Sequence, residues 1–153
     1  LKGENFAKKI FSTILRTNFI GKGSSKQKAN LSDWIVNNVK ENNEISTFKN
    51  IFFSPLHTTT LIKLIEKVLK AKRKGTFNLA AKTKISKAEF AKLLCKELKL
   101  NTRSINVLNY KYSNFLAKRP LDMSLNVTKF EKIFNTKLPK VTKEIKKLAK
   151  EYL

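Results

Sequence analysis

The sequence predicts an α/β fold in which neighbouring strands run parallel. Short runs rich in β-branched and apolar residues alternate along the chain with segments whose apolar residues recur every three or four positions. Strands that alternate with helices in this way form parallel sheets covered by the helices. The 153 residues, 41% hydrophobic with only four Gly and three Pro, suffice for one folded chain with its own core, and no segment repeats.

In the first half of the chain, Phe6 and Ile10 lie four positions apart, as on one side of an amphipathic helix. Ser32 and Asp33 can cap the first turn of a later helix, and Pro55 removes a backbone donor and so ends any helix before it. We therefore expect, in order, a helix at 2–10, a strand at 12–18, a polar loop at 22–30, a helix at 31–42 and extended structure at 45–53.

In the second half, Ser86 with Glu89 and Thr128 with Glu131 match the capping box that opens helices. Gly75 can supply the left-handed residue that ends one. We expect a helix from 58 to 74, a strand at 76–81, a helix at 86–98, a strand at 104–108, a helix at 128–134 and a last helix after Pro139 with Val141, Ile145, Leu148 and Tyr152 facing inward.

Lysine dominates the charge of the chain. The formal net charge is +22, with a pI near 10.2, and only four of the 33 basic residues are Arg. The lysines are spread over the polar sides of the predicted helices, and no helix-turn-helix, zinc-finger or base-stacking aromatic pattern accompanies them. We expect solvated lysine faces and no specific nucleic-acid partner; the alternative is a basic nucleic-acid-binding module.

Several classes of chemistry are excluded by composition. A single Cys and a single His cannot build a zinc cage or a His-dependent triad, so we expect no metal site, a packed thiol at Cys95 and a structural His57 without a carboxylate partner. No run of 18 apolar residues could span a membrane, and the first residues lack a secretory signal. We therefore expect a cytoplasmic protein with no membrane partner.

Four polar residues occupy positions where α/β proteins often place ligand contacts. Arg119, in a loop, is shaped to bind a phosphate, or else it only fixes that loop. Asn18 ends a predicted strand, where open α/β sheets bind ligands, or it bonds to its own turn. Asn30 resembles a helix cap, and Asp122 could accept ribose hydroxyls or pair with Lys118.

Short segments also follow one another in a distinctive order: Leu1-Lys2-Gly3-Glu4, Ile14-Leu15-Arg16-Thr17-Asn18, Asn30-Leu31 with Trp34-Ile35, Phe52-Phe53-Ser54-Pro55, Gly75-Thr76-Phe77-Asn78-Leu79, Ile85-Ser86-Lys87-x-Glu89-Phe90 and Arg119-Pro120-x-x-x-Ser124-Leu125. Together they resemble the second half of the extended short-chain dehydrogenase/reductases, in particular the dTDP-4-dehydrorhamnose reductases and the nucleotide-sugar epimerases. The resemblance covers almost the whole chain.

This resemblance implies a partial Rossmann-like fold, with C-terminal strands and a small α/β substrate-binding subdomain. Residues 1–23 would end the Rossmann-like part and residues 24–153 would mainly bind substrate, with the strand near 76–81 returning to the main sheet. The family's cofactor is NAD or NADP, but the glycine-rich loop and the catalytic Tyr and Lys are missing here. We therefore expect a truncated or excised fragment that is inactive alone, holds no cofactor and has no catalytic residue of its own.

By the same resemblance, Thr17 and Asn18 would lie near the nicotinamide. Nucleotide-sugar contacts would come from Phe19, Asn30, Leu31, Arg119 and Asp122. Related epimerases place a second phosphate-binding Arg just before the Phe-Phe strand, where this chain has Lys49-Asn50. Reductase and epimerase chemistry both stay open. Since half of a sheet would expose strand edges, we also expect a homo-oligomer.

Overall fold

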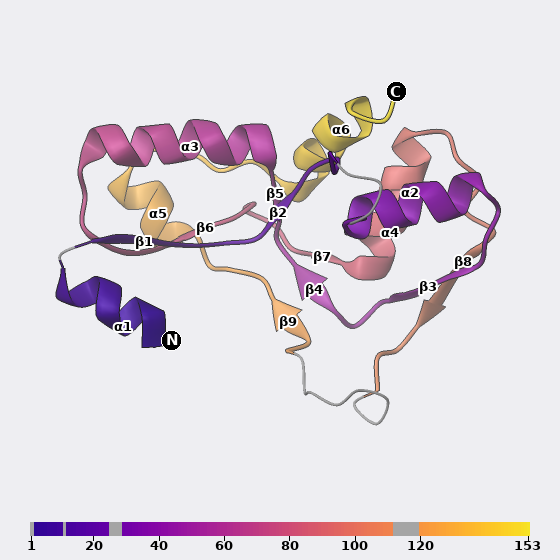
Figure 1. Cartoon of the computed structure of the whole chain (residues 1–153), viewed down its shortest axis with the longest axis horizontal. Helices are drawn as coiled ribbons and strands as arrows, with labels where there is room; N and C mark the ends of the chain where they lie inside the picture. Colours follow the sequence, from indigo (N-terminus) through magenta and orange to yellow (C-terminus); the bar gives the residue numbers. More distant parts are fainter. Residues whose placement is uncertain (1, 11, 25–28, 112–119) are drawn as a thin grey trace.

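The computed structural model describes residues 2–10, 12–24, 29–111 and 120–153. It is a mixed α/β structure whose strands pair mainly in parallel, as the sequence predicts. Figure 1 shows an elongated molecule with α3 along one end, α2 and α4 at the other, and the short central strands between them.

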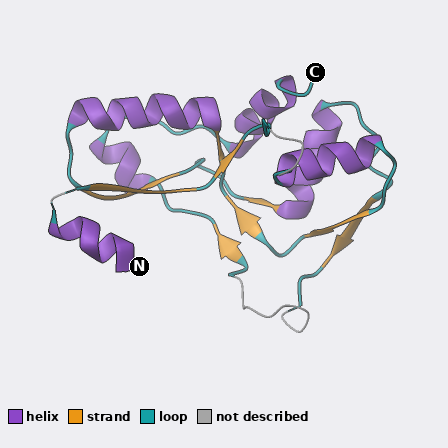
Figure 2. Ribbon diagram, viewed as in Figure 1, coloured by secondary structure: helices purple, strands orange, loops and turns teal. Residues whose placement is uncertain are grey.

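One end of the molecule is built on the parallel pair β1 (Thr13–Thr17) and β6 (Gly75–Leu79), in which Leu15 lies opposite Phe77. Helices α3 (Thr58–Ala71) and α5 (Thr128–Ile133) lie on one side of this pair and α1 (Lys2–Lys9) on the other (Figures 1 and 2). A bidentate ion pair between Arg16 and Glu4, with N–O distances of 2.8 and 2.6 Å, fastens α1 to β1. The strands predicted at 12–18 and 76–81 are thus confirmed, and the structure shows that they pair with each other.

At the centre of the molecule, the described residues form five very short strands. Strand β2 (Phe19–Ile20) pairs in parallel with β5 (Leu56–His57), while β4 (Phe52–Phe53) pairs with β7 (Ile85–Ser86) and with β9 (Asp122–Met123). None of these pairings is predicted from the sequence, because two residues are too few to show alternation of polar and apolar side chains.

At the far end, β3 (Ile45–Phe48) and β8 (Ile105–Leu108) form another parallel pair beside α2 (Leu31–Lys40) and α4 (Lys87–Glu97). The last helix, α6 (Val141–Lys150), packs against α4 and β5 near the centre (Figure 2). These elements bury a continuous apolar core whose fully buried side chains include Phe90, Phe130, Ile35, Leu56, Leu79, Leu94, Ile145 and Leu148.

Two predicted helix ends differ in the structure. Helix α3 ends at Ala71, and Lys72 rather than Gly75 is its left-handed cap, with a φ of 50°. The capping box predicted at Thr128 is wrong: Thr128 is already helical, its N–H is capped by the Asn126 side chain, and Glu131 instead accepts hydrogen bonds from Leu138 N and Lys82 Nζ. The box at Ser86 and Glu89 is confirmed.

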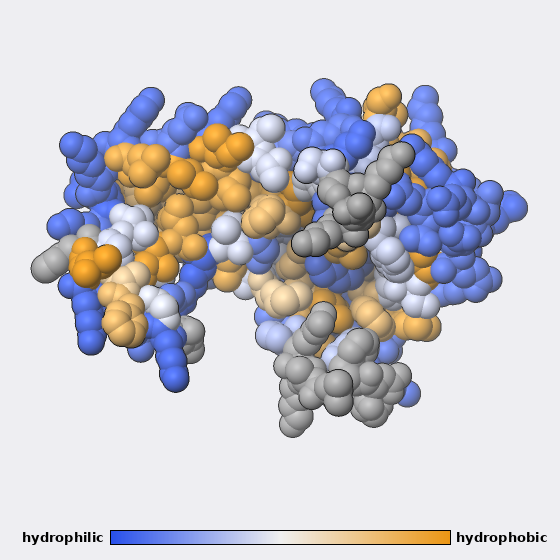
Figure 3. Space-filling view, in the orientation of Figure 1, coloured by the Kyte–Doolittle hydropathy of each residue, from blue (hydrophilic) through white to orange (hydrophobic). Residues whose placement is uncertain are grey.

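Apolar side chains remain exposed at the α3 end. Ile62 and Leu69 on α3 keep 57% and 69% of their surface exposed, and Phe6 and Ile10 keep 74% and 76%. Figure 3 shows apolar side chains gathered over this end, while the opposite end around α2, β3 and β8 is mainly hydrophilic. The apolar stripe predicted for α3 is therefore only partly covered, with Val68 its one buried residue.

Candidate functional site

Two adjoining pockets form one groove where the first residues of α2 and α4 meet β4 and β9. The first, of about 310 Å³, is lined by residues that include Asn18, Phe19 and Asn30. The second, of about 330 Å³, has an aromatic wall of Trp34, Phe48 and Tyr110, with Pro120 beside it. Leu31, Lys87 and Met123 line both pockets, so we describe the two together as the groove.

The polar end of the groove is shaped by the turn before α2. Asn30 is the N-cap of α2: its side-chain oxygen accepts from Ser32 N and Asp33 N, and its amide donates to Gly21 O. Asp33 completes the capping box by accepting from Asn30 N at 3.3 Å. Asn30, rather than Ser32 or Asp33, therefore starts the helix, which agrees with its resemblance to a cap.

Asp33 also ties the turn to the C-terminal end of the chain. Its carboxylate accepts hydrogen bonds from Gly23 N at 3.0 and 3.1 Å and from the Tyr152 hydroxyl at 2.5 Å. Burial and the neighbouring Asp33 carboxylate raise the pKa of Tyr152 above its usual range. The backbone of Lys22 is fixed similarly, through Lys22 N to Glu151 at 2.7 Å, so this wall of the groove is preformed.

Asn18 stands where the chain passes from β1, paired with β6, to β2, paired with β5. Its amide donates to Met123 O at 3.0 Å, and its side-chain oxygen accepts from Ser54 N at 3.2 Å. Its carbonyl accepts from Leu56 N at 3.0 Å. Asn18 thus lines the groove while holding β4, β5 and β9 together.

Lys87, the first residue of α4, lies at the junction of the two pockets. Its Nζ sits 3.3 Å from the centre of the buried Phe53 ring, and none of the ion pairs among the described residues includes it. Desolvation by burial lowers the pKa of Lys87 to about 8. The ring face attracts the half-buried ammonium and so offsets part of the cost of removing it from water.

Asp122 lies at the edge of β9 with both carboxylate oxygens engaged. One oxygen accepts from Lys84 Nζ at 2.6 Å and the other from Ser124 N at 2.9 Å. The hydrogen bond from Lys84 is the main reason that the pKa of Asp122 falls to about 2. Asp122 does not line either pocket of the groove, and its partner here is Lys84; the alternative partner, Lys118, lies outside the described residues.

The structure gathers four of the seven predicted site residues: Asn18, Phe19, Asn30 and Leu31 line the first pocket. Thr17, exposed at the end of β1, does not, and Arg119 lies outside the described residues. Thr17 lies outside the groove, and the Asn18 side chain bonds to the backbone of Met123 and Ser54; the contact of these two residues with a nicotinamide stays a prediction.

The expectation that His57 lacks a carboxylate partner is wrong. His57 caps α3, with Nδ1 accepting from Thr59 N, and its Nε2 lies 3.1 Å from Glu151. Its backbone N–H donates to Glu144, which is fully buried on α6 and ion-paired to Lys147 at 3.0 Å. These contacts hold α6 against the start of α3, so His57 has a structural role, as expected.

Other candidate chemistry is limited in the described part of the chain. Cys95 is fully buried, and burial raises the pKa of its thiol to about 11, so it is a packed thiol. Residues 2–10, 12–24, 29–111 and 120–153 hold no cluster of His, Cys, Asp or Glu suited to a metal ion. Within these same residues, no helix combines the length and the apolar character needed to cross a membrane.

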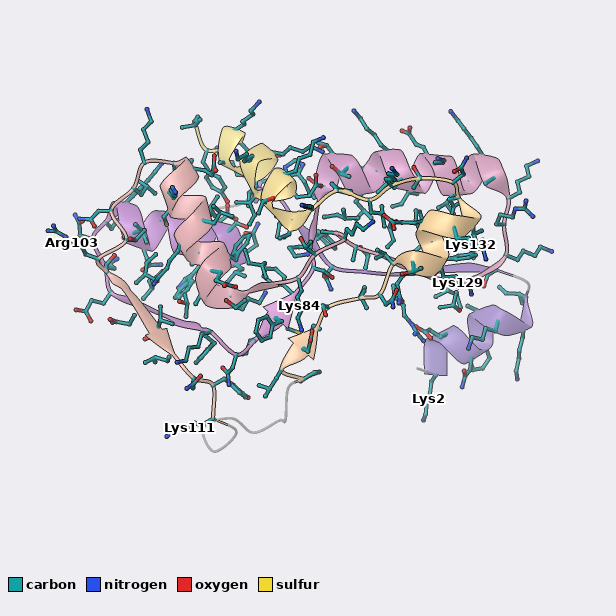
Figure 4. All side chains as sticks on the ribbon, turned by 180° about the vertical axis from the view of Figure 1, so that it is seen from behind. Lys2, Lys84, Arg103, Lys111, Lys129 and Lys132 are labelled. Atoms are coloured by element: carbon teal, nitrogen blue, oxygen red, sulfur yellow. The ribbon has the colours of Figure 1, made fainter. Side chains whose placement is uncertain are left out.

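The positive charge is scattered over the molecule. Figure 4 shows Lys2 on α1, Lys129 and Lys132 on α5, Lys84 near β4, and Arg103 and Lys111 at the end that holds β8. These labelled side chains come from several separate elements of the described part of the chain. The expectation of no specific nucleic-acid partner stays a prediction.

Sequence reasoning missed the residues that complete the groove, namely Lys87, Met123, Trp34 and Tyr110. Lys87 reads as one lysine among 29, and only its tertiary position sets it apart. Trp34 reads as part of a helical apolar face, although it keeps 38% of its surface exposed at the groove. The one available signal was the Ser-Lys-x-Glu-Phe segment, which places Lys87 at a capped helix start.

A groove bounded by helix starts and by short, mostly parallel strands is characteristic of α/β proteins that bind substrates beside their sheets. The family model described as the RmlD substrate binding domain matches residues 1–153, and the chain belongs to this family. A search of curated proteins gives no significant match.

Solved structures show the same fold. The dTDP-4-dehydrorhamnose reductase of Bacillus anthracis, in complex with NADP, superposes with a TM-score of 0.86 at 21% identity, over 97% of this chain and 52% of that one. The ortholog from Clostridium acetobutylicum gives 0.84 at 21% identity, over 99% and 53%. The dTDP-glucose 4,6-dehydratase DesIV of Streptomyces venezuelae gives 0.71 at 16% identity, over 99% and 46%. The chain thus spans about half the length of these structures.

Proposed function

We propose that this chain is the nucleotide-sugar-binding half of a reductase resembling the dTDP-4-dehydrorhamnose reductases. The observation that carries the proposal is the groove. The family model of a substrate-binding domain matches residues 1–153, and the groove is lined by residues that the sequence predicts to contact substrate. The finer assignments, including the roles of Phe19, Asn30, Leu31 and Arg119 and the boundary near residue 23, are part of this proposal.

The two pockets suit the two ends of such a substrate. The side-chain amides of Asn18 and Asn30 each have a second N–H beyond the one they donate to the backbone, and these N–H groups can meet the hydroxyls of a sugar. Trp34, Phe48 and Tyr110 offer aromatic rings for contact with a base. We propose the same substrate class if the parent enzyme is an epimerase or dehydratase, because those relatives share the fold.

The remaining elements of the proposal concern the chain's surroundings. The relatives named above include NADP- and NAD-bound structures, and we propose that a parent protein uses one of these cofactors while this chain alone holds none and is inactive. We also propose a cytoplasmic setting and self-association through the exposed apolar face of α3.

Calorimetric titration of the purified chain with dTDP and dTDP-rhamnose, at low and moderate salt, tests the proposal. Saturable binding that persists at moderate salt is expected, together with weaker binding by Arg119→Ala. Nonspecific attraction of a +22 protein for an anion would instead vanish as salt rises. The absence of saturable binding to either ligand at both salt concentrations would contradict a nucleotide-sugar site in this chain.

A further inference from the structure

Lys87 differs from Lys22, which also lines the groove, and from Lys84, which lies outside it, in that no oxygen among the described residues is bonded to its ammonium. Lys22 Nζ donates to the Glu151 carbonyl at 2.7 Å, and Lys84 is ion-paired to Asp122 at 2.6 Å. Among the described residues, no such oxygen is bonded to the Lys87 ammonium, and no Asp or Glu lines either pocket of the groove. Its charge is therefore left for a group from outside the chain.

The ammonium is also held in place. The Lys87 backbone N–H donates to Ile51 O at 2.9 Å, which fixes the start of α4. Phe53, 4% exposed and packed edge-to-face on Phe90, presents its ring 3.3 Å from Nζ. A cation–π contact of this kind offsets part of the desolvation cost and keeps the ammonium in the groove. An anion there would meet a positioned cation rather than a flexible surface lysine.

The position of Lys87 selects the kind of anion. Lys87 lines both the polar pocket, near Asn18 and Asn30, and the aromatic pocket, near Trp34 and Tyr110. A nucleoside-diphosphate sugar carries its negative charge between a planar base and a polar sugar. An occupant with the base on the aromatic wall and the sugar at the polar end would bring its diphosphate to the junction.

We propose that the Lys87 ammonium binds the diphosphate of the nucleotide sugar and thereby fixes which pocket receives the base and which the sugar. This inference rests on the proposed function and adds a specific residue to it. Lys49 and Asn50, ahead of β4, line neither pocket. Lys87, at the start of α4, lines both and supplies a cation there. A lysine suits this role as a compact charge that a diphosphate can approach from several directions.

Titration of the chain and two variants with dTDP tests this proposal. Lys87→Met keeps the apolar stem and removes the charge, while Lys92→Met makes the same charge change on the exposed side of α4. Loss of a charge-assisted contact to phosphate should weaken dTDP binding by Lys87→Met at least about tenfold. Lys92→Met should bind within about twofold of the unchanged chain, and thermal unfolding of each protein reports whether it is folded.

Acetylation by acetic anhydride, followed residue by residue with mass spectrometry, gives a second readout that needs no variant. Saturating dTDP, and pyrophosphate alone, should slow the modification of Lys87 and leave that of Lys92 unchanged. If the unchanged chain binds dTDP while Lys87→Met binds equally well and Lys87 is not protected, the proposal for Lys87 is overturned and the proposed function stands. If the unchanged chain binds neither dTDP nor dTDP-rhamnose, both are overturned.

Discussion

At the scale of the residue, Lys87 combines a binding role with a cost to stability. Burial lowers its pKa from 10.5 to about 8 in the folded chain. Between these pH values the unfolded chain binds a proton that the folded chain has released, so stability rises with pH across this window. Below pH 8 the folded chain carries the buried charge, and its full cost is present.

We therefore expect Lys87→Met to be more stable than the unchanged chain at pH 7, by up to about 3 kcal/mol. The advantage should shrink as pH rises from 8 and be lost near 10.5. Denaturant unfolding at several pH values measures it, with Lys92→Met correcting for the general loss of one positive charge. A Lys87→Met variant that is less stable at pH 7 would show that the ammonium is not penalised by burial.

Gly23 is a second residue whose surroundings matter for stability, because they leave no space for a larger side chain. A Cβ at this position would lie 2.3 Å from Asp33 Oδ2, and Asp33 is held by Asn30 and Tyr152. We expect Gly23→Ala to cost about 1–3 kcal/mol, because a fixed carboxylate must shift and the α2 cap with it. Gly3→Ala is the control: a Cβ at Gly3 meets nothing within 4 Å, so in helix α1 it should be neutral or slightly stabilising.

At the scale of the element, the ends of the helices separate what sequence can predict from what it cannot. Both Ser86 and Thr128 begin a Ser/Thr-x-x-Glu pattern. Ser86 has the extended backbone of a cap, but Thr128 is already the first residue of α5. A tertiary contact prevents a capping box at Thr128, because the Glu131 carboxylate accepts a hydrogen bond from Leu138 N instead.

This difference predicts unequal effects of two matched substitutions. Ser86→Ala removes the side-chain oxygen that accepts from Glu89 N at 3.1 Å, and we expect it to cost about 1 kcal/mol. Thr128→Ala removes a hydroxyl without a capping bond and should change stability by less than about 0.5 kcal/mol. Thermal or urea unfolding distinguishes the two variants. Equal losses of unfolding free energy would show that Thr128 does act as a helix cap.

At the scale of the whole molecule, periodicity in the sequence predicts the helices, the strands β1 and β6 and the α/β class, whereas the parallel pairing of β1 with β6 is seen in the structure. Periodicity does not predict the central strands, because each has only two residues. Their pairing depends on Asn18, whose side chain bonds to both Ser54 and Met123. The same holds for the groove: Asn30 and Leu31 follow from the family resemblance, whereas the exposure of Lys87 to both pockets arises only when α4 packs beside β4.

The exposed apolar end of the molecule predicts self-association. Ile62 and Leu69 on α3 are each more than half exposed, and neighbouring apolar surface of this kind is usually covered by a partner. The high positive charge opposes such contact at low salt, with Lys63, Lys67 and Lys70 on the same helix. Raising the salt concentration screens this repulsion, so association through the apolar surface should increase with salt.

Light scattering over a range of protein and salt concentrations measures this association. We expect an average mass above 17.6 kDa that grows with both, and a shift toward the monomer in Ile62→Glu/Leu69→Glu. Lys63→Glu/Lys70→Glu is the matched control, since it makes a larger change of charge on α3 while leaving both apolar side chains in place. If the control dissociates as fully as the apolar variant, the contact is electrostatic; if every protein stays monomeric at high salt, the α3 face does not mediate self-association.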